Sequence, residues 1–132
     1  MRMGMKREDI HAVDFDGTLS VGAEWPEIGQ ANLLLFAHLI SRRKCGHKVI
    51  LWTCREGQHL EDAMKFCTKY GLEFDAVNDN LQECKDFYQN NSRKVFAHHY
   101  YDDRNKSIYP GGMTLGAKKE LARLVKKFGK EI

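Results

Sequence analysis

Short apolar runs alternate with longer amphipathic stretches along this chain. The clearest run, residues 49–52, contains four apolar residues in succession, which is typical of a strand covered on both faces of a parallel sheet. Related patterns predict strands over residues 10–15, 47–53, 74–78 and 95–101. Because strands that alternate with helices form parallel sheets covered on both sides, we expect a three-layer α/β/α sandwich.

The stretches between these strands predict helices. Residues 30–44 place Leu33, Phe36, Ala37 and Ile40 on one helical face, and residues 56–70 space Leu60, Ala63, Met64 and Cys67 three or four positions apart, with Gly71 as the stop. Part of the polar stretch 79–92 is also expected to be helical. After a Pro110-Gly111-Gly112 turn, a final helix carries Leu121, Leu124, Val125 and Phe128 on one stripe.

Length and composition favour one globular domain over residues 1–132. With 42% hydrophobic residues, the chain can build a core of its own. The net charge of +3 suits an anionic substrate, but it is too small for the dense basic surface of a dedicated nucleic-acid-binding protein.

Several features favour a cytoplasmic protein that does not enter membranes. The four cysteines form no C-x-x-C pair, which favours reduced thiols over a zinc site or a disulfide scaffold. The longest apolar run, residues 33–39, is interrupted by His38 and is too short to span a bilayer. Residues 1–9 are charged and lack the apolar stretch of a signal peptide.

Polar residues mark the ends of the predicted strands. Asp14 and Asp16 follow the first strand, Thr53 the second, and Asp102 and Asp103 the last, while Lys94 directly precedes the last strand. Because ligand sites in such sheets lie at the carboxyl ends of the strands, we expect these side chains to converge. Clustered carboxylates repel one another unless a cation lies among them, and Mg²⁺ is the cation that carboxylate and phosphate oxygens suit best.

The sequence Asp14-Phe15-Asp16-Gly17-Thr18 has the residue types that phosphoryl transfer requires. A carboxylate at an exposed strand end, here Asp14, can attack phosphorus beside a metal. Asp16 lies two residues later and therefore leans over the same edge, where it can protonate the leaving oxygen and then deprotonate water. Gly17 permits a sharp turn, and the N–H groups of Gly17 and Thr18 can hold phosphate oxygens. The side chains of Thr53 and Lys94 can bind the phosphoryl oxygens.

Four segments resemble the motifs of the haloacid dehalogenase superfamily, in the family's order. Residues 14–19 resemble motif I, residues 49–53 motif II, Lys94 motif III and residues 100–103 motif IV. The resemblance extends from about residue 10 to residue 104. It implies a Rossmann-like core and a Mg²⁺-dependent phosphohydrolase.

The resemblance also implies a role for each matching residue. Asp14 would become an aspartyl-phosphate, and Asp16 would act as the acid and base and give its backbone carbonyl to Mg²⁺. Thr53 and Lys94 would hold the phosphoryl group. Asp103 would bind the metal directly, with Asp102 supporting it directly or through water. The gaps between motifs leave no room for a large cap domain, so the chain resembles a small capless bacterial member.

The sequence constrains the identity of the substrate less than it constrains the type of reaction. Residues 53–56 and 102–105 resemble small bacterial hydrolases of unassigned substrate and, in part, the phage-type polynucleotide 3′-phosphatase domain. A nucleotide, a sugar phosphate and a 3′-phosphorylated polynucleotide all remain candidates. Arg55 and Arg104 would bind a distal phosphate of the substrate or pair with Glu56 and the acidic pair. An uncapped site would accept bulky substrates or be closed by a neighbouring subunit, which leaves a homo-oligomer open.

Two other classes of protein remain as alternatives. A phosphoacceptor signalling domain shares an acidic Mg²⁺ site, but its acidic pair follows the first strand. A catalytically silent binding protein would keep the fold, although both Asp14 and Asp16 are present here.

Three nearby features have structural interpretations. Trp25 is expected to close the edge of the core rather than to stack on a substrate, and Cys54 is expected to pack rather than to react. His98 and His99 should lie on opposite faces of a strand, which favours structural roles.

Overall fold

The central element is a parallel four-stranded sheet. The computed structural model describes residues 8–105 and 114–129. The strands β1 (Ile10–Val13), β4 (Lys48–Leu51), β5 (Ala76–Val77) and β6 (His99–Tyr101) pair in the order β5-β4-β1-β6, and all three pairings are parallel. All four predicted strands are therefore confirmed, with shorter bounds than expected.

Side chains of the two central strands alternate between the two faces of the sheet. In β1, Ala12 packs into one buried cluster and Val13 into the other. In β4, Ile50 joins the cluster of Ala12, whereas Val49 and Leu51 join that of Val13. Since both faces are covered, the apolar run of residues 49–52 has no exposed polar positions. The three-layer α/β/α architecture is confirmed.

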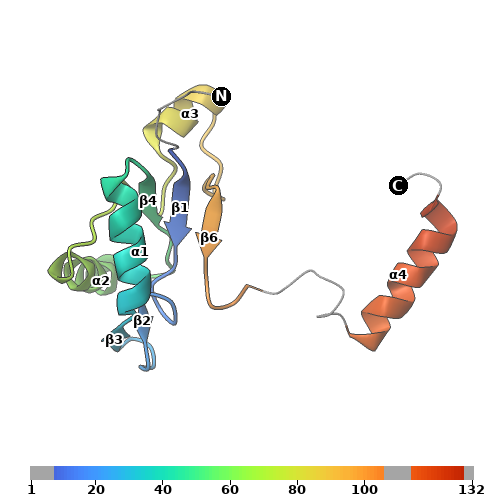
Figure 1. Ribbon diagram of the computed structural model, residues 1–132, viewed down its shortest axis with the longest axis horizontal. Coiled ribbons are helices and arrows are strands. Elements are labelled where there is room, and N and C mark those ends of the chain that lie inside the picture. Colours follow the sequence, from blue (N-terminus) through green and yellow to red (C-terminus); the bar gives the residue numbers. More distant parts are fainter. Residues whose placement is uncertain (1–7, 106–113, 130–132) are drawn as a thin grey trace.

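The helices α1 (Leu33–Lys44) and α2 (Gly57–Lys69) cover the face that contains Val13 (Figure 1). They contribute Phe36, Leu39, Ala63 and Cys67 to the buried cluster. The expected face of α1 is partly wrong, because Leu33 is 63% exposed and Ala37 is also exposed. The helix begins three residues later than predicted, with Asn32 as its N-cap, and Leu39 replaces Ala37 in the core.

The opposite face is covered by α3 (Gln82–Tyr88) and by the segment that leads into β6. Val95 and Ala97 are buried there, yet residues 95–98 do not form the predicted strand. Side chains take the place of ladder partners: Asn80 Oδ1 accepts from Phe96 N at 2.7 Å, and Tyr100 Oη donates to Val95 O at 2.6 Å. The prediction failed because periodicity records burial and not the partner of each backbone group.

A short hairpin stands where a cap domain would be inserted. The strands β2 (Ser20–Val21) and β3 (Gln30–Ala31) pair antiparallel between β1 and α1. Figure 1 shows this hairpin beyond the end of the sheet to which the strands point. The described part of the chain contains no large cap, as expected.

The last helix, α4 (Leu115–Phe128), begins where Thr114 Oγ1 accepts from Ala117 N at 3.2 Å. The predicted apolar stripe is present, but none of its side chains is buried. The predicted turn at residues 110–112 lies outside the described residues. Among the described helices, none is long and apolar enough to cross a membrane.

Candidate functional site

Three carboxylates meet at the carboxyl ends of the neighbouring strands β1 and β6. Asp14 follows β1, and Asp102 and Asp103 follow β6. The parallel register pairs Val13 with Tyr101, and Asp14 N donates to Tyr101 O at 2.9 Å. One oxygen of each of the three carboxylates lies within 4.8 Å of the others. The sheet order therefore brings together residues that are almost 90 positions apart.

The cluster raises the energy of ionised Asp14. The pKa of Asp14 is raised to about 6, by burial first and then by the nearby carboxylates of Asp102 and Asp103, against opposing effects of the Phe15 N–H and the Thr18 hydroxyl. A divalent cation with a preference for oxygen ligands would relieve this repulsion, and the donor set consists of hard carboxylate oxygens. The residues present therefore fit the Mg²⁺ ion that the sequence predicts.

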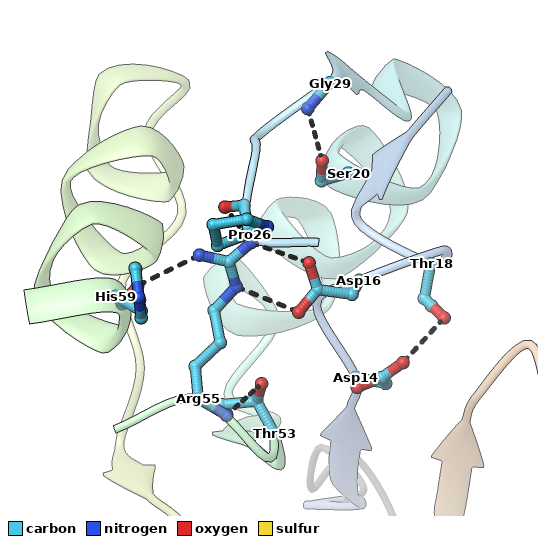
Figure 2. A network of polar contacts seen from close by, with 9 residues as sticks. All are labelled: Asp14, Asp16, Thr18, Ser20, Pro26, Gly29, Thr53, Arg55 and His59. Atoms are coloured by element: carbon cyan, nitrogen blue, oxygen red, sulfur yellow. Dashed lines mark hydrogen bonds and ion pairs between the residues drawn. The ribbon is translucent and has the colours of Figure 1, made fainter. Parts of the chain in front are cut away.

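The turn after β1 holds the cluster together. Gly17 adopts φ +80°, and a Cβ at this position would overlap Oδ2 of Asp103. The Thr18 hydroxyl donates to Asp14 Oδ2 at 3.3 Å (Figure 2). It also accepts from Asp103 N at 3.2 Å. The N–H groups of Gly17 and Thr18 donate to Ser20 O and Phe15 O. These donors, predicted to hold phosphate oxygens, are thus used within the turn.

A cavity of about 580 Å³ lies in front of these carboxylates. Asp14, Asp16, Asp102 and Asp103 line one part of it, and Trp25, Cys54 and Arg104 line another. Trp25 is 59% exposed, so it does not close the core edge as expected. Cys54 is also exposed and does not pack in the core.

Asp16 forms an ion pair with a buried arginine. Arg55 Nη2 lies 2.7 Å from Asp16 Oδ1, and Arg55 Nε lies 2.9 Å from Asp16 Oδ2 (Figure 2). Arg55 is 1% exposed and does not line the cavity that contains Asp14. In this structure its guanidinium therefore contacts neither of the partners that the sequence suggested, Glu56 or the acidic pair.

Thr53 and Lys94 lie at the periphery of the cluster. Thr53 follows β4, and its Oγ1 accepts from Arg55 N at 3.1 Å. Lys94 is exposed, with its ammonium 5.4 Å from the centroid of the Tyr100 ring. It lines a neighbouring cavity of about 300 Å³ that shares Asp102 with the main one. Neither side chain lines the cavity of Asp14 itself.

Sequence reasoning missed the partner of Asp16. Arg55 lies four residues after the end of β4, and its position in the sequence does not reveal that its side chain turns inward. His98, just before β6, and His99, its first residue, both make structural contacts: His98 Nδ1 accepts from Ile10 N, and His99 Nε2 lies 2.9 Å from Asp9 Oδ2.

No protein-family profile and no curated protein matches the chain. Among solved structures, a conserved protein of Bacteroides thetaiotaomicron is 34% identical in sequence, with a TM-score of 0.65. The similarity covers 92% of this chain and 92% of that one. The chain therefore belongs to the same family as this conserved Bacteroides protein.

Proposed function

We propose that this protein is a Mg²⁺-dependent phosphohydrolase of the haloacid dehalogenase type that cleaves phosphomonoesters through phosphorylated Asp14. The observation that carries the proposal is the juxtaposition of Asp14 with Asp102 and Asp103, whose oxygens lie within 4.8 Å of one another. Asp16 lines the same cavity. The resemblance of residues 14–19 to motif I supports the assignment.

In the first step, a carboxylate oxygen of Asp14 attacks the phosphorus atom. The bond from phosphorus to the leaving oxygen breaks, and this oxygen keeps the electron pair and takes a proton from Asp16. In the second step, water attacks the aspartyl-phosphate and gives its proton to Asp16, which releases phosphate and restores Asp14. Thr53 and Lys94 are proposed to hold phosphoryl oxygens.

A cation would be held by Asp14, Asp102 and Asp103, together with the backbone carbonyl of Asp16. Bound Mg²⁺ supplies positive charge that offsets the charge of the phosphate and of the carboxylates around it. Asp14 must be ionised to act as a nucleophile, so the cation and the nucleophile depend on each other.

The substrate is proposed to be a phosphomonoester of a nucleotide, of a sugar or of a polynucleotide 3′ end. The cavity is large enough for a small phosphate ester, at about 580 Å³. A screen of phosphorylated metabolites and 3′-phosphorylated oligonucleotides would distinguish these classes.

The first test is phosphate release from a generic aryl phosphate, with Mg²⁺ or with EDTA. We expect Mg²⁺-dependent release by the wild type and a loss of at least about 100-fold in Asp14→Asn, because the amide is not a nucleophile. Asp86→Asn is the matched control, since this exposed carboxylate on α3 accepts only a surface hydrogen bond from Gln82. Release that survives in Asp14→Asn would exclude the assigned nucleophile.

A further inference from the structure

The largest of the fully buried side chains is a charged one, Arg55, at 1% exposure. An ion removed from water costs several kcal/mol unless close partners compensate. The structure must therefore supply those partners, and their identity indicates what this arginine does.

The partners of Arg55 come from three parts of the chain. Its Nε and Nη2 donate to the two carboxylate oxygens of Asp16 at 2.9 and 2.7 Å. Nη2 also donates to Pro26 O at 3.0 Å, and Nη1 donates to His59 O at 3.3 Å on α2 (Figure 2). The guanidinium carbon lies 4.9 Å from the ring centroids of both Phe15 and Trp25. The guanidinium is thus held both at its edge and over ring faces.

This arrangement fixes the orientation of the Asp16 carboxyl group. The two parallel hydrogen bonds of a fork-to-fork pair leave little freedom of rotation about the bond to the carboxyl carbon. Each oxygen keeps a second lone pair, and the Asp16 side chain is still 38% exposed and lines the cavity of Asp14. The Asp16 carboxyl group is therefore held by Arg55 on one side and open to the cavity on the other.

We propose that Arg55 is the positioning residue of the proposed phosphohydrolase, holding Asp16 so that the proton on the open side of its carboxyl group faces the leaving oxygen of the substrate. The inference rests on the proposed function of Asp16 as proton donor. Arg55 itself is not placed to contact the substrate, since it does not line the cavity of Asp14 and four of its five guanidinium N–H groups donate to Asp16, Pro26 or His59.

The same chain contains an arginine–aspartate pair away from the site, which serves as the control for a purely structural role of Arg55. Arg43 makes the same two-bond contact with Asp75, at 3.2 Å from Nε and 2.8 Å from Nη2. Arg43 lies in the last turn of α1, and Asp75 accepts from Val49 N in β4, apart from the carboxylate cluster. A variant of this pair should change stability and leave the chemistry unchanged.

The test compares Arg55→Lys with Arg43→Lys on two substrates that differ in their leaving group. Lysine keeps the charge but cannot make the fork contact. Dinitrophenolate leaves without a proton, whereas the alkoxide of glycerol 2-phosphate needs one. The quantity to compare is kcat/KM, because it reports the steps up to departure of the leaving group.

For Arg55→Lys we expect kcat/KM to fall by about 100-fold on glycerol 2-phosphate and by less than about 10-fold on 2,4-dinitrophenyl phosphate, because a misplaced proton donor affects only the first. Arg43→Lys should lower the melting temperature without this selectivity. Equal losses on both substrates in Arg55→Lys would overturn the inference and leave the proposed function intact. Failure of the wild type to hydrolyse either substrate would overturn both.

A second comparison uses Asp16→Asn alone and together with Arg55→Gln. The double variant replaces the ion pair with two amides and leaves no unpaired buried charge. It can therefore be measured even if Arg55→Lys fails to fold. If Arg55 acts through Asp16, the double variant should have the same kcat/KM on glycerol 2-phosphate as Asp16→Asn, within about 3-fold. A loss of kcat/KM in the double variant that is much larger than in Asp16→Asn alone would show that Arg55 acts independently of Asp16, and it would overturn the inference.

Discussion

At the scale of single residues, charge and burial conflict at His11. This side chain is 2% exposed, and its ring nitrogens contact Tyr101 Oη and His47 Nδ1, each at 2.9 Å. Its pKa is lowered to about 4 by burial first, then by the neighbouring histidines, against a smaller opposing effect of Asp9. The titratable groups around it are Asp9, His38, His47, His99 and Tyr101. Protonation of His11 therefore opposes folding.

This conflict predicts a loss of stability in mild acid. Between pH 6.5 and about 4 the unfolded chain binds the proton of His11 more tightly than the folded chain does, so stability falls as the pH drops through this window. The full effect is on the order of 3 kcal/mol. His11→Gln, which forms hydrogen bonds but does not titrate, should flatten the decline.

Urea unfolding at pH 7 and at pH 5 would measure the effect of His11. The exposed His59 gives the control variant, His59→Gln, whose decline should match that of the wild type. A wild-type decline that persists unchanged in His11→Gln would contradict the assignment to His11.

At the scale of elements, the segment of residues 95–98 depends on one buried amide. Asn80, 6% exposed, accepts from Phe96 N and donates to Ser92 O and Asn91 Oδ1. These bonds hold Val95 and Ala97 against the sheet without a strand. For Phe96 N, Asn80 therefore takes the role that a neighbouring strand has in a regular sheet.

We expect Asn80→Ala to lower the free energy of unfolding by roughly 2 kcal/mol, because it removes a buried amide and leaves the partly buried Phe96 N and Ser92 O without their partners. The exposed Asn90→Ala should cost less than about 0.5 kcal/mol. Chemical denaturation of the three proteins would measure the difference. Comparable unfolding midpoints for Asn80→Ala and the wild type would show that water satisfies the segment instead.

At the scale of the whole molecule, metal binding should couple to folding through Asp14. Without a cation, its folded pKa of about 6 lies above the ordinary 3.8, so the folded chain binds this proton more tightly and stability falls as the pH rises through that window. A cation that binds only the folded chain would recover this loss. We expect millimolar Mg²⁺ to raise the melting temperature at pH 8 by several degrees and to have much less effect at pH 5.

Thermal melting with Mg²⁺ or EDTA at both pH values would measure this coupling. The gain at pH 8 should disappear in Asp14→Asn and persist in Asp86→Asn. An equal gain in Asp14→Asn would place the cation elsewhere on the protein.

Much of the fold was predictable because it depends on local patterns. The apolar run of residues 49–52 and the spacing of Leu60, Ala63, Met64 and Cys67 predicted β4 and α2 to within two residues at each end. The periodicity of apolar residues predicts these elements because each face of the helix or strand is either buried or exposed along its whole length. It failed at residues 95–97, where the side chains of Asn80 and Tyr100 hydrogen-bond to the backbone, whereas His98 N donates to a neighbouring strand, at Ile10 O.

The sequence by itself determined the residue types at the strand ends, and so the expectation that Asp14, Asp102 and Asp103 would meet. The rule that parallel strands end at the same edge is enough for that. Only the tertiary structure decided that Trp25 lines the cavity, that Lys94 lies on Tyr100 and that Arg55 is buried against Asp16. These contacts join loops, strand ends and helices far apart in the chain, and side-chain direction there depends on packing that no local pattern records.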